Sequence, residues 1–120
     1  MVKLKASAAQ YDVSQDFFAI MTEAICLHSN RTMKFQTLRT VVAVISERLY
    51  DQEFDPNHFQ IFIDTVPISG PNRIYLKVET CINVRLTEMK VRLEKIHGFP
   101  LSDRTAIAYF VHLGIEQNLY

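Results

Sequence analysis

The sequence predicts a mostly helical α+β fold, in which two strand–helix–helix units are joined in one chain of 120 residues. Residues 2–7 and 81–86 alternate apolar and polar side chains, which is the period of a β-strand. The stretches behind them place apolar residues three and four apart, which is the period of an amphipathic helix. The same order of elements therefore occurs twice, and we expect both copies to share a single domain over residues 1–120.

The first unit spans residues 1–50. Its predicted strand carries Lys3, Lys5 and Ser7 on the face opposite its apolar residues. Ser14 is a good N-cap residue, because its hydroxyl can accept a hydrogen bond from the first helical turn. The helix behind it is expected to break in HSNRTMKFQ, residues 28–36. A second helix follows, with an apolar stripe of Leu38, Val41, Val42, Ile45 and Leu49.

The second unit spans residues 80–120. Only Thr87 separates its predicted strand from the helical pattern that follows, so Thr87 is the expected N-cap. Gly98 can adopt the left-handed conformation that ends a helix, and Ser102 can cap the next helix. The outward side chains of the predicted strand are Cys81, Asn83 and Arg85.

The second helix of each unit begins with a similar short sequence, which we call the RT motif, and this similarity supports duplication. RTVVAV begins at Arg39 and RTAIAY begins at Arg104, sixty-five residues later. The connector, residues 51–79, carries two basic and five acidic groups. In it, HFQIFID and RIYLKVE flank the turn PISGPN, so we expect a hairpin there.

A unit of this size cannot bury its apolar faces alone, and a lone strand has unpaired edges. Both problems disappear if the two strands pair antiparallel and the helices share one core. We expect a monomer with an internal pseudo-twofold axis. Its two-stranded ribbon fits the major groove of double-stranded DNA, where Arg, Lys, Asn and Ser side chains read base edges. The expected core residues are Leu38, Ile45, Leu86, Leu93 and Phe110.

The stretches INVRLTEMKVRLEKI and SDRTAIAYFVHLGIE resemble the ribbon-helix-helix DNA-binding proteins. The resemblance implies base contacts from alternate strand residues, and a phosphate held at the start of each second helix. The implied base-contacting residues are Lys3, Lys5, Ser7, Asn83 and Arg85. The implied phosphate-contacting residues are Ser102 and its neighbour Arg104 in the second unit, and Arg31, Thr32 and Lys34 in the first.

Two such units in one chain resemble the C-terminal DNA-binding region of the VirC-operon virulence proteins, which promote T-DNA transfer from tumour-inducing plasmids into plants. The resemblance implies an accessory DNA-binding role in a conjugation-like system, with a relaxase or other DNA-transfer proteins as partners in crown gall formation. Two alternatives are a ribbon-helix-helix transcriptional repressor or antitoxin, and a protein-interaction module that has lost DNA binding. The diverged strands favour an asymmetric DNA site over a palindromic operator.

Composition excludes several other classes. The formal net charge is zero, although both ends of the chain are mildly basic. The four histidines have no metal-site spacing, and three glycines form no phosphate-binding loop. We therefore expect no enzyme activity, no cofactor and no metal. No apolar run approaches the ~20 residues of a membrane helix. The two cysteines, Cys26 and Cys81, have neither metal-site nor redox spacing, so nothing argues for an oxidising compartment and a cytoplasmic protein is expected.

Overall fold

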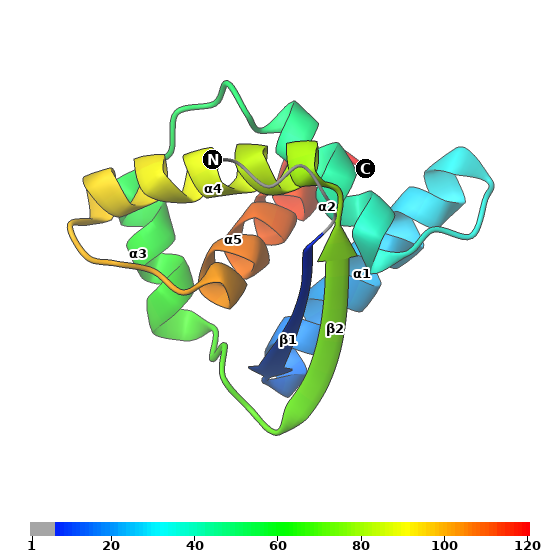
Figure 1. Ribbon diagram of the computed structural model, residues 1–120, viewed down its shortest axis with the longest axis horizontal. Coiled ribbons are helices and arrows are strands. Elements are labelled where there is room, and N and C mark those ends of the chain that lie inside the picture. Colours follow the sequence, from blue (N-terminus) through cyan, green and yellow to red (C-terminus); the bar gives the residue numbers. More distant parts are fainter. Residues whose placement is uncertain (1–6) are drawn as a thin grey trace.

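Two strands and five helices follow one another in the computed structural model, which describes residues 7–120 (Figure 1). This confirms the predicted class, a mostly helical α+β fold. The strands are β1 (Ser7–Val13) and β2 (Asn72–Val78), and the helices are α1 (Gln15–Thr32), α2 (Leu38–Arg48), α3 (Pro56–Thr65), α4 (Thr80–His97) and α5 (Asp103–Glu116).

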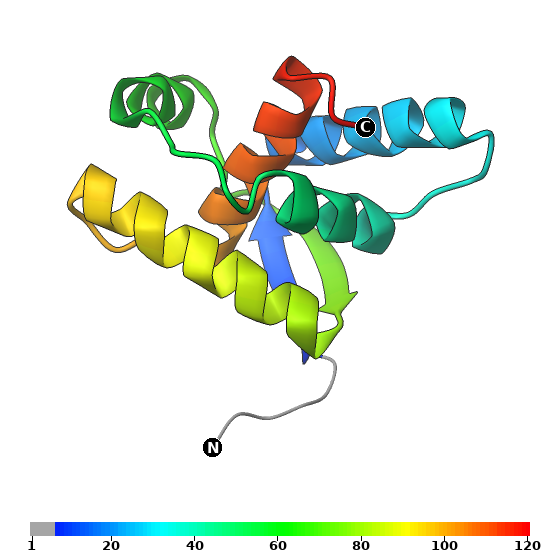
Figure 2. The same ribbon diagram turned by 90° about the horizontal axis from the view of Figure 1, so that it is seen from above.

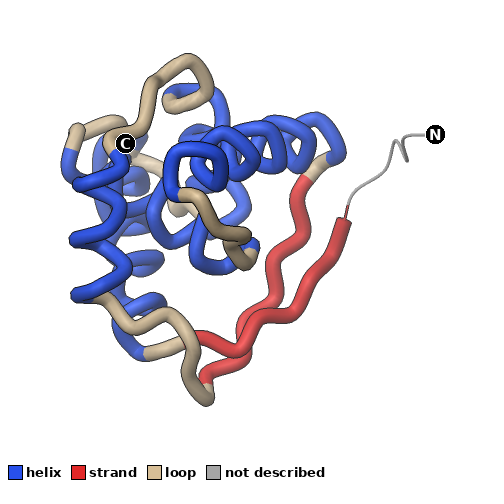
Figure 3. Tube along the Cα trace, turned by 90° about the vertical axis from the view of Figure 1, so that its left-hand side faces the viewer, coloured by secondary structure: helices blue, strands red, loops and turns tan. Residues whose placement is uncertain are grey.

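The two strands pair antiparallel into one small sheet. The register runs from Ser7 opposite Val78 to Val13 opposite Asn72. Figure 3 shows both strands along one side of the molecule, with the helices on the other side. The face toward the helices buries Val13, Leu76 and Val78. The other face is open to solvent.

Helix α5 runs through the middle of the helical layer, between α1 and α4 (Figure 2). All residues of 106–111 are buried. The expected core is confirmed, because Ile45, Leu93 and Phe110 are buried in a single cluster. Leu38 and Leu86 are partly buried and pack against that cluster.

Three predicted helix ends are confirmed. The Ser14 hydroxyl accepts a hydrogen bond from the backbone N–H of Phe17, and the Ser102 hydroxyl accepts one from Thr105. Gly98 ends α4 with a φ of 91°, in the left-handed region that glycine adopts without strain. These signals are local hydrogen-bonding and steric preferences, which explains why they were visible in the sequence.

The predicted strand at 81–86 is wrong, because these residues form the first turns of α4. Six alternating residues also fit a helical stripe, in which Ile82 and Leu86 lie four apart and lead on to Met89 and Leu93. Thr87 is not an N-cap, and its hydroxyl donates to the carbonyl of Asn83 within the helix.

The hairpin expected in the connector is also wrong. RIYLKVE contributes to β2 as expected, but its partner is β1. HFQIFID lies in α3, because Pro56 suits the first helical turn and the Asp55 carboxylate accepts hydrogen bonds from Asn57 and His58. The apolar residues of α3 follow the helical period, with Phe59 and Phe62 buried.

The first unit differs from the prediction at two points. The predicted strand at 2–7 lies almost wholly outside the described residues, and the observed strand begins at Ser7. Helix α1 continues through the expected break to Thr32, and it ends only where Met33 takes a φ of 57°. The polar run before Met33 is compatible with a helix and gave no true stop signal.

Candidate nucleic-acid interface

The outer face of the sheet carries five exposed side chains. Successive strand residues point to opposite faces, so the residues between the buried ones all face outward. We call this surface the ribbon face; its residues are Gln10 and Asp12 of β1, and Arg73, Tyr75 and Lys77 of β2. The ring of Tyr75 is largely in water, because the residue is 68% exposed.

The register pairs these side chains across the two strands. Gln10 lies opposite Tyr75 at the centre of the sheet, and Asp12 lies opposite Arg73. The Arg73 Nε donates to Asp12 Oδ1 at 3.1 Å. This hydrogen bond and the Asp12 charge raise the pKa of the Arg73 guanidinium. The ribbon face therefore has an ion pair at one end.

Each end of the sheet is held to the first turn of a helix by an arginine. Arg39 of α2 forms an ion pair with Glu79, directly after β2, at 3.6 Å. Arg104 of α5 donates to the backbone carbonyl of Asp12 at 2.5 Å. These arginines are the first residues of the two RT motifs, and each contacts one end of the sheet.

The threonines of the two RT motifs, Thr40 and Thr105, stabilise the starts of their helices. Thr40 and Thr37 form a reciprocal capping box at the start of α2, since each side chain accepts from the other's backbone N–H. Thr105 lies against the Ser102 hydroxyl at the start of α5, with 2.8 Å between the two oxygens. The amino termini of α2 and α5 are thus both capped by side-chain hydroxyl groups.

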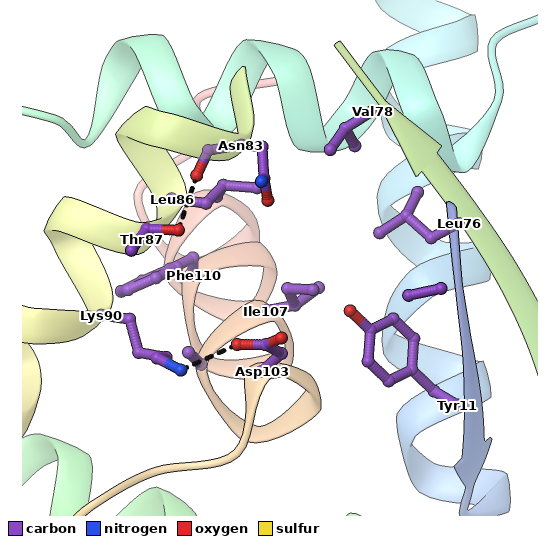
Figure 4. Close-up of a pocket in the computed structure, with 12 residues that line it drawn as sticks. Tyr11, Leu76, Val78, Asn83, Leu86, Thr87, Lys90, Asp103, Ile107 and Phe110 are labelled. Carbon is purple, nitrogen blue, oxygen red and sulfur yellow. Dashed lines mark hydrogen bonds and ion pairs between the residues drawn. The ribbon is translucent and has the colours of Figure 1, made fainter. Parts of the chain in front are cut away.

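The inner face of the sheet is a packing surface. A cavity of about 40 Å³ lies between it and helices α4 and α5 (Figure 4). This space is small and partly open to solvent, and both apolar and polar side chains line it. Lys90 and Asp103 form an ion pair of 2.8 Å at its edge. Burial, together with the Asp103 charge, raises the pKa of the Tyr11 phenol in the cavity wall.

The structure does not place the predicted base-contacting residues Asn83 and Arg85 on the sheet. Both lie on α4, where Asn83 lines the cavity and Arg85 is half-buried. Lys3 and Lys5 lie outside the described residues, and Ser7 is the first residue of β1.

The predicted phosphate-contacting residues separate into two groups. Ser102 and Arg104 lie at the start of α5, and Arg104 contacts the end of β1. Arg31 and Thr32 instead lie in the last turn of α1, where Arg31 donates to the Asn118 side chain at 2.8 Å and Thr32 donates to the carbonyl of His28. Lys34 is exposed in the loop that follows.

Sequence reasoning missed all five residues of the ribbon face. The signal that could have identified them is the spacing of the two RT motifs. Adding sixty-five to Ser14, the first N-cap, gives Glu79, the observed N-cap of α4. That spacing would have placed the second strand before Glu79 rather than at 81–86.

Other kinds of site are absent from the described chain. Residues 7–120 contain no cluster of three or more side chains suited to a metal ion. Among the helices in that range, none has both the length and the apolar character needed to cross a membrane. No protein-family model, curated protein or solved structure matches the chain.

Proposed function

We propose that the protein binds double-stranded DNA by inserting the ribbon face into the major groove. The observation that carries this proposal is a two-stranded antiparallel sheet with one face buried on helices and the other covered by exposed polar and aromatic side chains. A ribbon of this width fits the major groove, and side chains such as Arg, Lys and Gln read base edges there.

The charges around the ribbon face support an anionic partner. The three carboxylates on or beside it are each paired with a cation: Asp12 with Arg73, Glu79 with Arg39, and Asp103 with Lys90. Lys77 and Arg104 form no ion pair with any residue in 7–120. The ribbon face and its edges therefore carry two cations that are not neutralised, although the whole chain has a net charge of zero.

We further propose that the architecture is a ribbon-helix-helix fold made of two pseudo-symmetric units in one chain. Equivalent elements begin sixty-five residues apart: β1 and β2 at 7 and 72, α1 and α4 at 15 and 80, α2 and α5 at 38 and 103. Gln10 and Tyr75, also sixty-five apart, pair with each other. A twofold axis through that pair would relate the two strands and the helix starts beside them.

Within this proposal, the tandem units favour an accessory role at a T-DNA border over a repressor role. The support is the resemblance to the VirC-operon proteins, together with the unequal ribbon halves. Cutting and export of the strand would then belong to a relaxase and other partners.

A fluorescence anisotropy titration with random and border-region duplexes, repeated at several salt concentrations, tests DNA binding directly. We expect the logarithm of the binding constant to fall linearly with the logarithm of the salt concentration. Lys77→Ala should weaken binding to all duplexes and reduce the slope by about 0.9, the value for one lost phosphate contact.

The matched control is Lys95→Ala, which makes the same charge change on an exposed residue in the last turn of α4. Helix α4 begins beside the end of β2 and runs away from the sheet (Figure 1). It should leave affinity and slope near the wild-type values. Equal effects of the two substitutions would mean that only overall charge matters, and salt-independent or absent binding would remove DNA as the ligand.

A further inference from the structure

The two ends of the ribbon face differ in chemistry. At one end Asp12 and Arg73 form an ion pair across the strands. At the other end Lys77 lies opposite Ala8, which has no polar side chain. One end of the ribbon face therefore carries an ion-paired guanidinium, and the other carries a single exposed amine.

The atoms used in the ion pair leave the rest of the guanidinium available. Arg73 engages the carboxylate through Nε, at 3.1 Å from Asp12 Oδ1. The side chain is 56% exposed, and the side chain of Tyr75 is a second neighbour of the guanidinium on the ribbon face. Two terminal amino groups on one planar fork are the donors that bind the O6 and N7 acceptors of guanine.

Asp12 is itself held from the helical side. Arg104 of α5 donates to its backbone carbonyl, while its carboxylate holds Arg73. A chain of contacts therefore runs from the start of α5 through Asp12 to the ribbon face. Holding an arginine in this way reduces the side-chain freedom lost when it binds a base.

We propose that Asp12 is a positioning residue that holds Arg73 for bidentate contact with a guanine, and that the target duplex is consequently non-palindromic. This inference rests on the proposed DNA binding. The residues related to Arg73 and Asp12 by the sixty-five-residue spacing are Ala8 and Lys77, which cannot form such a pair. The second half-site is read by different chemistry.

Selection from a pool of randomised duplexes tests the proposal, with the wild type, Arg73→Lys and Asp12→Asn each used as the selecting protein. The wild type should enrich a non-palindromic sequence with a G·C pair at one end. Arg73→Lys keeps the charge but lacks the fork, so it should lose preference at that position alone. For the wild type, replacing that G·C pair should weaken binding about tenfold or more, as for a good bidentate contact.

Glu79→Gln is the matched control for Asp12→Asn. It removes one carboxylate charge from an exposed ion pair at the opposite end of the sheet, where Glu79 pairs with Arg39. Both substitutions should raise affinity for random duplexes slightly, because each removes a charge that repels phosphate. Only Asp12→Asn should reduce the preference for guanine, which a general loss of structure would not do at one position. Circular dichroism of each variant confirms that it is folded.

The outcomes separate this inference from the proposed function. Binding without sequence preference, a palindromic selected site, or an unchanged guanine preference in either Arg73→Lys or Asp12→Asn would overturn the inference and leave DNA binding standing. Failure to bind any duplex would overturn both.

Discussion

Replacing Gly70 with alanine should damage the junction that fixes one end of the ribbon face. Gly70 lies just before β2, against the point where β1 passes into α1. An added Cβ would lie 2.5 Å from Ser14 Cα and 2.7 Å from the Val13 carbonyl oxygen. Both are backbone atoms, so no side-chain rotation relieves the contact, and the connector must move away from the strand.

The expected destabilisation follows from the contacts at this junction. Overpacking of a filled site costs roughly 1–3 kcal/mol. Moving the connector also strains two hydrogen bonds, from the Ser14 backbone N–H to the Ile68 carbonyl and from the Ser14 hydroxyl to the Pro67 carbonyl, each contributing about 1 kcal/mol. Alanine restricts the unfolded chain and returns about 0.4–1 kcal/mol. We therefore expect a net loss of about 2–4 kcal/mol in the free energy of unfolding.

Urea denaturation followed by circular dichroism measures this loss. Gly98→Ala is the matched control, because a Cβ there meets no atom within 4 Å and the only penalty is the left-handed backbone. That penalty is about 1 kcal/mol. If Gly70→Ala were no less stable than Gly98→Ala, the close approach of the connector to Ser14 would be refuted.

Three further predictions concern the core, pH and assembly. Leu93→Ala should lower the free energy of unfolding by about 2–5 kcal/mol, while Ile96→Ala on the same helix, where Ile96 is 41% exposed, should lower it much less in the same urea titration. Burial raises the pKa of Tyr109 to about 12 from its ordinary value of 10, so the unfolded chain releases this proton first. Stability should therefore be full below pH 10 and fall between pH 10 and 12, and in Tyr109→Phe that fall should be shallower. Sedimentation at micromolar concentration should give a monomer near 13.9 kDa, and a stable dimer would contradict the internal pairing of the two proposed units.

The features that sequence reasoning predicted correctly depend on neighbouring residues. Ser14 and Ser102 were recognised as N-caps because a hydroxyl before an apolar stripe satisfies the first backbone N–H groups of a helix. Gly98 was recognised because few other residues adopt a positive φ. The core positions Ile45, Leu93 and Phe110 followed from helical spacing alone, and the structure buries all three.

The pairing of the strands was missed because it is set by distant residues. Residues 81–86 alternate as a strand does, but they also supply one face of a longer stripe through Leu93, and the longer pattern corresponds to the larger buried area. The observed strand β2, NRIYLKV, contains the β-branched and aromatic residues that are typical of strands. Its partner β1, SAAQYDV, is weakly apolar and lies sixty-five residues away in the chain. No local window contains both.

The position of the second strand affects the candidate site more than it affects the fold. Moving the second strand nine residues along the chain leaves the class and most of the core unchanged, but it replaces every side chain which that strand places on the outer face. Asn83 and Arg85 are replaced by Arg73, Tyr75 and Lys77, and the ion pair between Asp12 and Arg73 exists only because the register places those residues opposite each other. The two RT motifs were a sequence signal that links residues sixty-five positions apart, and their arginines contact the ends of the two strands. In this chain the sixty-five-residue spacing of the RT motifs points to the observed second strand, whereas the alternation at 81–86 does not, because six alternating residues also fit one face of a helix.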